Sequence, residues 1–240
     1  MKLHLSLKVV FSILFFLNSA TVLAETEVQS PLVEVRVPQD TLAPYRDRRG
    51  TNGLMIGIDY EALVLKNFFS VEDGSTYSDL FGSDAIPFLH FAIDYKYNFF
   101  LGSLTFGPDY GTGTISKNGS SLDVERYGVG LRYIADILMP EPYVAPYVGV
   151  NAWRMSTVEK DNSTKFTGSN TTGIAYNYTV GLLVQLDWLD HDSAKQGTFG
   201  YGLQNTYLDI YVTQYTKTGD AADVDTETDL LWGAGLKLEF

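Results

Sequence analysis

The sequence contains no cysteine, which excludes disulfide frameworks, cysteine-ligated zinc sites and thiol catalysis. Histidine is almost as scarce: three residues in a chain of 240 argue against a metal site built from several histidines. Charged residues make up only 19% of the chain, and the net charge of −12 lacks the basic footprint that nucleic-acid binding requires. We therefore expect no cofactor, no metal site and no nucleic-acid partner.

Long hydrophobic runs are also missing, apart from a short one near the start. Lys2 and Lys8 accompany the apolar run Val9–Leu17, and the small residues Val22 and Ala24 follow it. This run is too short to cross a bilayer, which takes about 20 apolar residues. The pattern predicts a secretory signal peptide over residues 1–24 and therefore export, with no helical membrane span after it.

The next segment, residues 25–50, is interrupted by prolines and ends in a cluster of arginines. Its valines alternate with polar residues over 33–37, which would allow a short edge strand, but an extended tail is the simpler interpretation. We expect a periplasmic N-terminal linker whose arginines lie near phospholipid head groups at the inner interface: Arg46, Arg48 and Arg49.

What the chain does contain is a hydrophobic period of two, which is typical of β-strands. In the first segment Leu54, Ile56 and Ile58 share one face, while Asp59 and Glu61 lie on the other. Most segments exceed the ~5–6 residues of a typical globular strand and reach the ~9–11 that a tilted membrane strand needs. Eight segments follow this pattern: 53–63, 86–98, 99–115, 122–137, 143–157, 172–189, 200–216 and 227–240.

Aromatic residues close the apolar faces of alternate segments, as expected for the girdle at one membrane interface. The connections alternate in length, and four polar ones are expected to face outside: 64–85, 116–121, 158–171 and 217–226. The turn at 190–198 is longer than the others on its side. We predict an all-β fold, an eight-stranded antiparallel transmembrane β-barrel over residues 51–240 with its apolar faces toward lipid. The interface aromatics are Tyr95, Tyr97, Tyr133, Trp188 and Phe240.

The last residues, Leu236-Lys237-Leu238-Glu239-Phe240, alternate and finish in phenylalanine. Here the chain resembles the small eight-stranded outer-membrane barrels of Gram-negative bacteria, namely the OmpA membrane domain, OmpX and OmpW. The segment 146–151 is similar to a strand motif of OmpW-like proteins. The resemblance implies location in the outer membrane, with outer-membrane lipid and lipopolysaccharide as partners. It also implies that the barrel assembly machinery reads Leu236, Leu238 and Phe240. No peptidoglycan-binding domain is expected after the barrel.

The polar face of the strands would line the barrel lumen, where charges must be paired or hydrated. Two interpretations remain open. The charges form a salt-bridged plug, or they gate a narrow path for small solutes; the OmpW resemblance implies a path for small hydrophobic molecules. The predicted lumen residues are Asp59, Glu61, His90, Asp94, Lys96, Arg126, Arg132, Asp187, Asp209, Lys237 and Glu239.

An enzyme is the less favoured interpretation. His90 and Asp94 share a face, but at ~3.3 Å per residue they lie roughly 13 Å apart, too far to form a catalytic pair. We therefore expect a non-enzymatic protein with a structural or surface-interaction role or a narrow solute path. The alternative is a soluble secreted barrel that binds an apolar ligand, which requires the apolar faces to point inward. The acidic outer loops, with Glu72, Asp73 and Asp79, suit either solvent or divalent ions that bridge to lipopolysaccharide.

Overall fold

The computed structural model describes residues 43–161, 164–220 and 223–240. The predicted signal peptide and most of the predicted linker lie outside these residues and stay predictions. The described residues belong to one compact unit. The predicted start of the barrel domain at residue 51 stays a prediction, and the first strand begins at Asn52.

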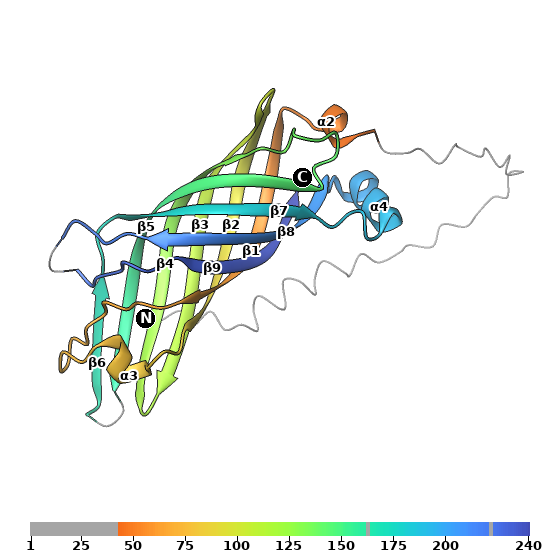
Figure 1. Cartoon of the computed structure of the whole chain (residues 1–240). Coiled ribbons are helices and arrows are strands. Elements are labelled where there is room, and N and C mark those ends of the chain that lie inside the picture. Colours follow the sequence, from red (N-terminus) through yellow and green to blue (C-terminus); the bar gives the residue numbers. More distant parts are fainter. Residues whose placement is uncertain (1–42, 162–163, 221–222) are drawn as a thin grey trace, which may run out of the picture. The chain divides into compact units, whose positions relative to one another are not determined.

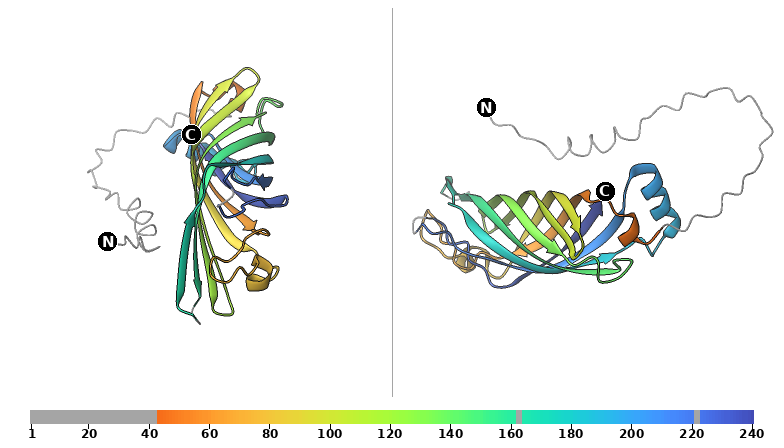
Figure 2. Two further views of the ribbon diagram at one scale, coloured as in Figure 1. Left: turned by 90° about the vertical axis from the view of Figure 1, so that its left-hand side faces the viewer. Right: turned by 90° about the horizontal axis from the view of Figure 1, so that it is seen from above.

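The described residues form nine strands that close into an eight-stranded antiparallel barrel (Figures 1 and 2). Strands that follow one another in the sequence pair with each other except β6 and β7, and β1 pairs with β9 to close the wall. Because β5 pairs with β7 along its first part and with β6 along its last part, β6 and β7 together make one barrel strand. The predicted barrel is confirmed. The strands are β1 (Asn52–Leu63), β2 (Ile86–Phe99), β3 (Gly102–Lys117), β4 (Ser120–Ile134), β5 (Val144–Asp161), β6 (Phe166–Thr171), β7 (Ala175–Gln185), β8 (Asn205–Tyr215) and β9 (Leu231–Glu239).

Among the described residues, three short helices lie at the two ends of the barrel (Figure 1). Helices α2 (Tyr45–Arg48) and α4 (His191–Tyr201) lie at the end where β1 begins and β9 ends, which we call the terminal end. Helix α3 (Tyr77–Phe81) lies at the opposite end, the loop end. None of the described helices has the length and apolar character needed to cross a membrane.

The barrel is inverted relative to a soluble protein, because its outer surface is apolar and most of the charged side chains of its strands are buried inside. Along β2 buried and exposed residues alternate without a break from Ile86 to Asn98. The outward side chains of Leu89, Phe91 and Ile93 are 41–54% exposed, whereas Asp94, the next residue after Ile93, is buried. The alternative of a soluble barrel requires the apolar faces of the strands to point inward. In the structure these faces point outward, which argues against that alternative.

Three predicted connections differ from the structure. The expected loop 116–121 is a tight turn at Asn118 and Gly119, both with positive φ, because β3 and β4 remain paired up to it. The expected loop 158–171 is mostly strand, since the end of β5 pairs with β6. The long turn 190–198 is helix α4, whose first amide groups are capped by the Asp190 side chain. We predicted loops in these segments because their residues are polar. Strands that extend beyond the apolar outer surface of a barrel are also polar, so composition alone does not distinguish the two.

Inward-facing glycines explain how large polar side chains fit inside so narrow a barrel. Gly181 lies opposite Tyr147 in the β5–β7 ladder, and Gly233 lies opposite Tyr211 in the β8–β9 ladder. A Cβ atom on either glycine would collide with the facing tyrosine ring. The glycines therefore leave the space into which the neighbouring lumen side chain folds.

Candidate functional site

The middle of the lumen holds a buried cluster around Lys237 on β9. The ammonium group of Lys237 contacts Asp59 on β1 and lies 3.5 Å from Asp209 on β8. Tyr147 on β5, which only β7 separates from β8, donates a hydrogen bond from its hydroxyl group to Asp209 at 2.9 Å. The side chains of all three charged residues are at most 7% exposed. One lysine thus compensates two buried carboxylates, which makes this cation critical for the cluster.

Two arginines pair with carboxylates elsewhere in the lumen. Arg132 on β4 lies 2.7 Å from Asp94 on β2. Arg126, closer to the loop end, contacts Asp109 and lies 2.9 Å from the Nδ1 atom of His90. The other ring nitrogen of His90 lies 3.5 Å from Glu61. The sequence predicted the arginines and carboxylates of these clusters apart from Asp109.

Near the terminal end, Lys96 on β2 lies 2.7 Å from Glu239 and 2.8 Å from Asp136. The hydroxyl group of Tyr45 sits among them, donating to Glu239 at 2.6 Å and accepting from Lys96 at 2.8 Å. Tyr45 is completely buried. A tyrosine from the segment before the barrel therefore fills the lumen opening at the terminal end.

Arginines hold the Tyr45 segment against the rim. Arg48 donates to the side chain of Gln204 at 2.8 Å, and Arg49 donates to the carbonyl oxygen of Phe99 at 2.7 Å. Arg49 also forms an ion pair of 2.9 Å with Asp136. Arg46 remains more than half exposed. The prediction that these residues belong to an extended linker beside lipid head groups does not describe Arg48 and Arg49, because carboxylate and carbonyl partners on the barrel hold both.

Asp136 follows β4 and lies under this segment. Its burial raises the pKa of the carboxyl group, but Lys96, Ser103 and Arg49 outweigh that effect and lower the pKa below its ordinary value of 3.8. The carboxylate form of Asp136 is therefore favoured by the groups that hold the Tyr45 segment.

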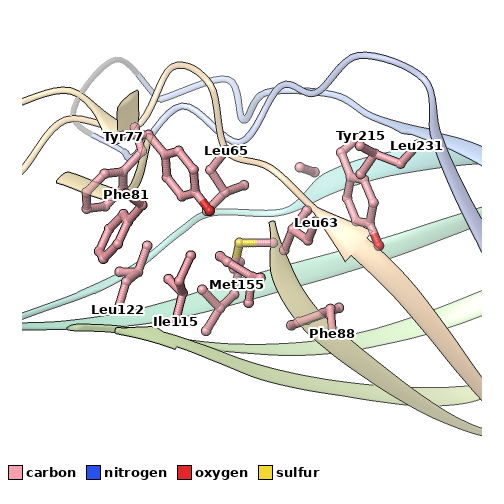
Figure 3. Close-up of a cluster of buried hydrophobic side chains, with 14 of the residues drawn as sticks. Leu63, Leu65, Tyr77, Phe81, Phe88, Ile115, Leu122, Met155, Tyr215 and Leu231 are labelled. Carbon is pink, nitrogen blue, oxygen red and sulfur yellow. The ribbon is translucent and has the colours of Figure 1, made fainter. Parts of the chain in front are cut away.

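The loop end is closed in a different way, by an apolar core beneath loop 64–85 (Figure 3). Tyr77 and Phe81 of α3 point into the barrel toward side chains from its walls, with their ring centroids 5.2 Å apart. Helix α3 is fixed at its start by a capping box between Thr76 and Asp79. The main buried residues are Leu63, Leu65, Phe68, Tyr77, Phe81, Ile86, Phe88, Ile115, Leu122, Val124, Trp153, Met155, Ala175, Tyr215 and Leu231.

Between the two closures the lumen is nearly full. The central cavity, lined by the charged clusters, has a volume of about 30 Å³. At about 10–15 Å³ for each water molecule, this volume holds roughly two to three waters. The lumen of the described barrel is therefore a packed interior and not an open channel.

The structure places almost all of the predicted lumen residues inside the barrel. Ten of the eleven predicted residues line or approach this interior; Arg132 is half-buried and the other nine are buried. Asp187 is the exception, because β7 ends at Gln185 and Asp187 accepts a hydrogen bond from the backbone of Thr206 at 3.0 Å. The prediction missed Asp109, although the alternation of the third segment, continued past Gly107, would have placed it inward.

The predicted interface aromatics lie at the terminal end on the outer surface. Tyr97 and Tyr133 each contact Phe99, with ring centroids 6.3 Å apart in both pairs. Tyr95 and Trp188 are about half exposed, and Trp188 lies in the turn after β7. Phe240 is half-buried, and its backbone forms hydrogen bonds with Leu54.

Among the described residues, no three His, Asp or Glu side chains are placed to hold a metal ion. His90 is buried between Arg126 and Glu61, and Asp94 is paired with Arg132. The structure thus keeps His90 and Asp94 in separate pairs, as their spacing along one strand requires.

A scan of family models and a search of curated proteins gave no match. Among solved structures, the chain is similar to Ail of Yersinia pestis, with 13% identity, 79% of this chain and 97% of that chain covered, and a TM-score of 0.44. Neisserial surface protein A gives 14% identity, 80% and 98% coverage, and a TM-score of 0.44. The N-terminal β-barrel domain of Pseudomonas aeruginosa OprF gives 11% identity, 80% and 100% coverage, and a TM-score of 0.44. The strand register described above establishes the eight-stranded architecture independently of these similarities.

Proposed function

We propose that this chain is a non-enzymatic outer-membrane β-barrel with a closed lumen, whose outer loops form its working surface. The observation that carries the proposal is the closure of the lumen at three levels: the apolar core, the paired charges and Tyr45. A structural or surface-interaction role follows, because a solute would have to displace all three. The gated path is the weaker interpretation for the same reason.

The outer surface supports the membrane location. Its apolar side chains, with Tyr97 and Tyr133 near one edge, suit a hydrocarbon layer bounded by an interface. In this orientation the loop end faces outside and the terminal end faces the periplasm. Its partners are outer-membrane lipid and lipopolysaccharide. During assembly, the barrel assembly machinery recognises Leu236, Leu238 and Phe240.

The test is insertion and solute flux in the same vesicles. The mature chain, refolded in detergent and shown to be β-rich by circular dichroism, is reconstituted into phospholipid vesicles. We expect it to float with the vesicles and to leave their permeability to small sugars unchanged. Recovery in the soluble fraction would contradict the membrane location, and rapid sugar entry would contradict the closed lumen.

A further inference from the structure

The seam between the first and last strands opens at the loop end. The β1–β9 ladder ends at the pair Glu61–Gly233. Beyond it β1 stays paired with β2 as far as Leu63, and β9 stays paired with β8 as far as Leu231. The two strands are thus each held by their other neighbour while the ladder between them stops.

A cavity of about 580 Å³ lies at this opening, within the ~300–1,000 Å³ range of small-molecule sites. Tyr77 and Leu231, both members of the apolar core, form part of its lining. Ser78 and Ser83, on and just after α3, complete the opposite side. The cavity therefore connects the core of the loop end with the surface of the barrel.

The outer surface leads directly into this cavity. Leu230 lines it and is 65% exposed, and Trp232, the next outward residue of that row, is 61% exposed. On the β1 side, Val64 continues the outward row that includes Tyr60. The lipid-facing surface of both strands is therefore continuous with the cavity wall.

An ion pair stands at the edge of the cavity. Lys66 contacts Asp229 across the seam, and both side chains are more than half exposed. An apolar cavity with an ionic edge matches an amphipathic molecule, whose chain is buried while its charged group remains in water.

We propose that this cavity binds one hydrocarbon chain of an outer-leaflet lipid, with the phosphate of its head group beside Lys66. The inference rests on the proposed membrane location, because the cavity opens onto the lipid-facing surface. Lipid is favoured over a ligand from the water phase by the continuity of Leu230 and Val64 with that surface.

The test is native mass spectrometry of the refolded mature chain, released from dodecyl maltoside containing lysophosphatidylglycerol. We expect one retained lipid in the unmodified chain. Ser78→Trp fills the cavity and should lower retention at least tenfold. Ser169→Trp, at an exposed serine on β6 outside the cavity lining, should retain the lipid. Ser83→Trp replaces Ser78→Trp if that variant does not refold.

Equal retention by the cavity-filling variant and Ser169→Trp would overturn the inference. Lys66→Gln tests the head-group position: it should lower retention of lysophosphatidylglycerol and leave retention of dodecyl maltoside unchanged. An equal loss of both, or no loss of either, would contradict the place assigned to the phosphate. Vesicle flotation of the same variants separates the two proposals. Failure of every variant to float rejects the membrane location, whereas flotation with unaltered lipid retention rejects only the lipid cavity.

Discussion

The two ends of the lumen are closed by opposite kinds of chemistry. At the loop end, apolar side chains such as Phe81 and Phe88 pack beneath a loop that folds back over the barrel. At the terminal end, one tyrosine is set among Lys96, Glu239 and Asp136. Apolar closure is non-directional and tolerates substitutions that keep the volume. Ionic closure depends on each partner, since a buried charge that loses its partner is costly.

The largest expected effect comes from breaking the ionic interior. Lys237→Met leaves Asp59 and Asp209 without their shared cation and should cost about 3–5 kcal/mol of unfolding free energy. Urea unfolding in detergent micelles, followed by circular dichroism, measures this loss. Adding Asp59→Asn and Asp209→Asn should restore a large part of it. A single variant as stable as the unmodified chain would show that the pairs are not buried as described.

Breaking the apolar closure should cost somewhat less. Phe81→Ala removes a completely buried ring and should destabilise the loop end by about 3 kcal/mol, since loop 64–85 can partly collapse into the space. Faster cleavage within this loop by protease, with the strands intact, is the measurement. The matched control is Phe69→Ala, because Phe69 in the same loop is 58% exposed. Equal cleavage of the two variants would refute the packing of α3 into the lumen.

The terminal closure should respond to the loss of one hydroxyl group. Tyr45→Phe keeps the ring but removes the hydrogen bonds to Glu239 and Lys96, and should cost about 1.5–3 kcal/mol. Urea unfolding again gives the value. Tyr143→Phe, at a half-exposed tyrosine near the same end, should change it by less than about 0.5 kcal/mol. Equal losses for the two variants would contradict the buried position of Tyr45.

The smallest expected effect is a dependence on pH of the closure at the terminal end. The lowered pKa of Asp136 means that it stabilises the folded chain above its ordinary pKa of 3.8, and that this contribution is lost as the pH falls through the folded value. Acidification below about pH 4 should therefore loosen the Tyr45 segment. The chain has no cysteine, so Arg46→Cys introduces a single site for a spin label that reports the mobility of this segment. Asp136→Asn should give a mobile label already at neutral pH, and an immobile one there would refute the contact.

The difference between the two closures also explains what could be read from the sequence. The barrel and its lumen charges were predictable because alternation assigns each residue to a face. Asp59, Arg126 and Lys237 follow this parity, and it fails only where a strand ends, as it does before Asp187. Which face of a strand a residue occupies follows from its position in the alternation and does not depend on tertiary contacts, so it can be predicted from the sequence alone.

The closures themselves were not predictable from the same signal. Near the loop end the inward positions Leu63, Ile86 and Phe88 are apolar, so the contrast between the two faces weakens there. Tyr45 stands alone in a segment without periodicity, and its partners Lys96 and Glu239 are 51 and 194 residues away. Such contacts are set by how the ends of the strands meet in space.

The closed lumen is tested most directly by single-channel recording of the refolded chain in a planar bilayer. We predict no discrete current steps from the unmodified chain. We also predict none from Tyr45→Ala, because the apolar core and the paired charges still fill the lumen when the terminal closure is removed. Reproducible steps from the unmodified chain, once folding is shown by circular dichroism, would contradict the closed lumen.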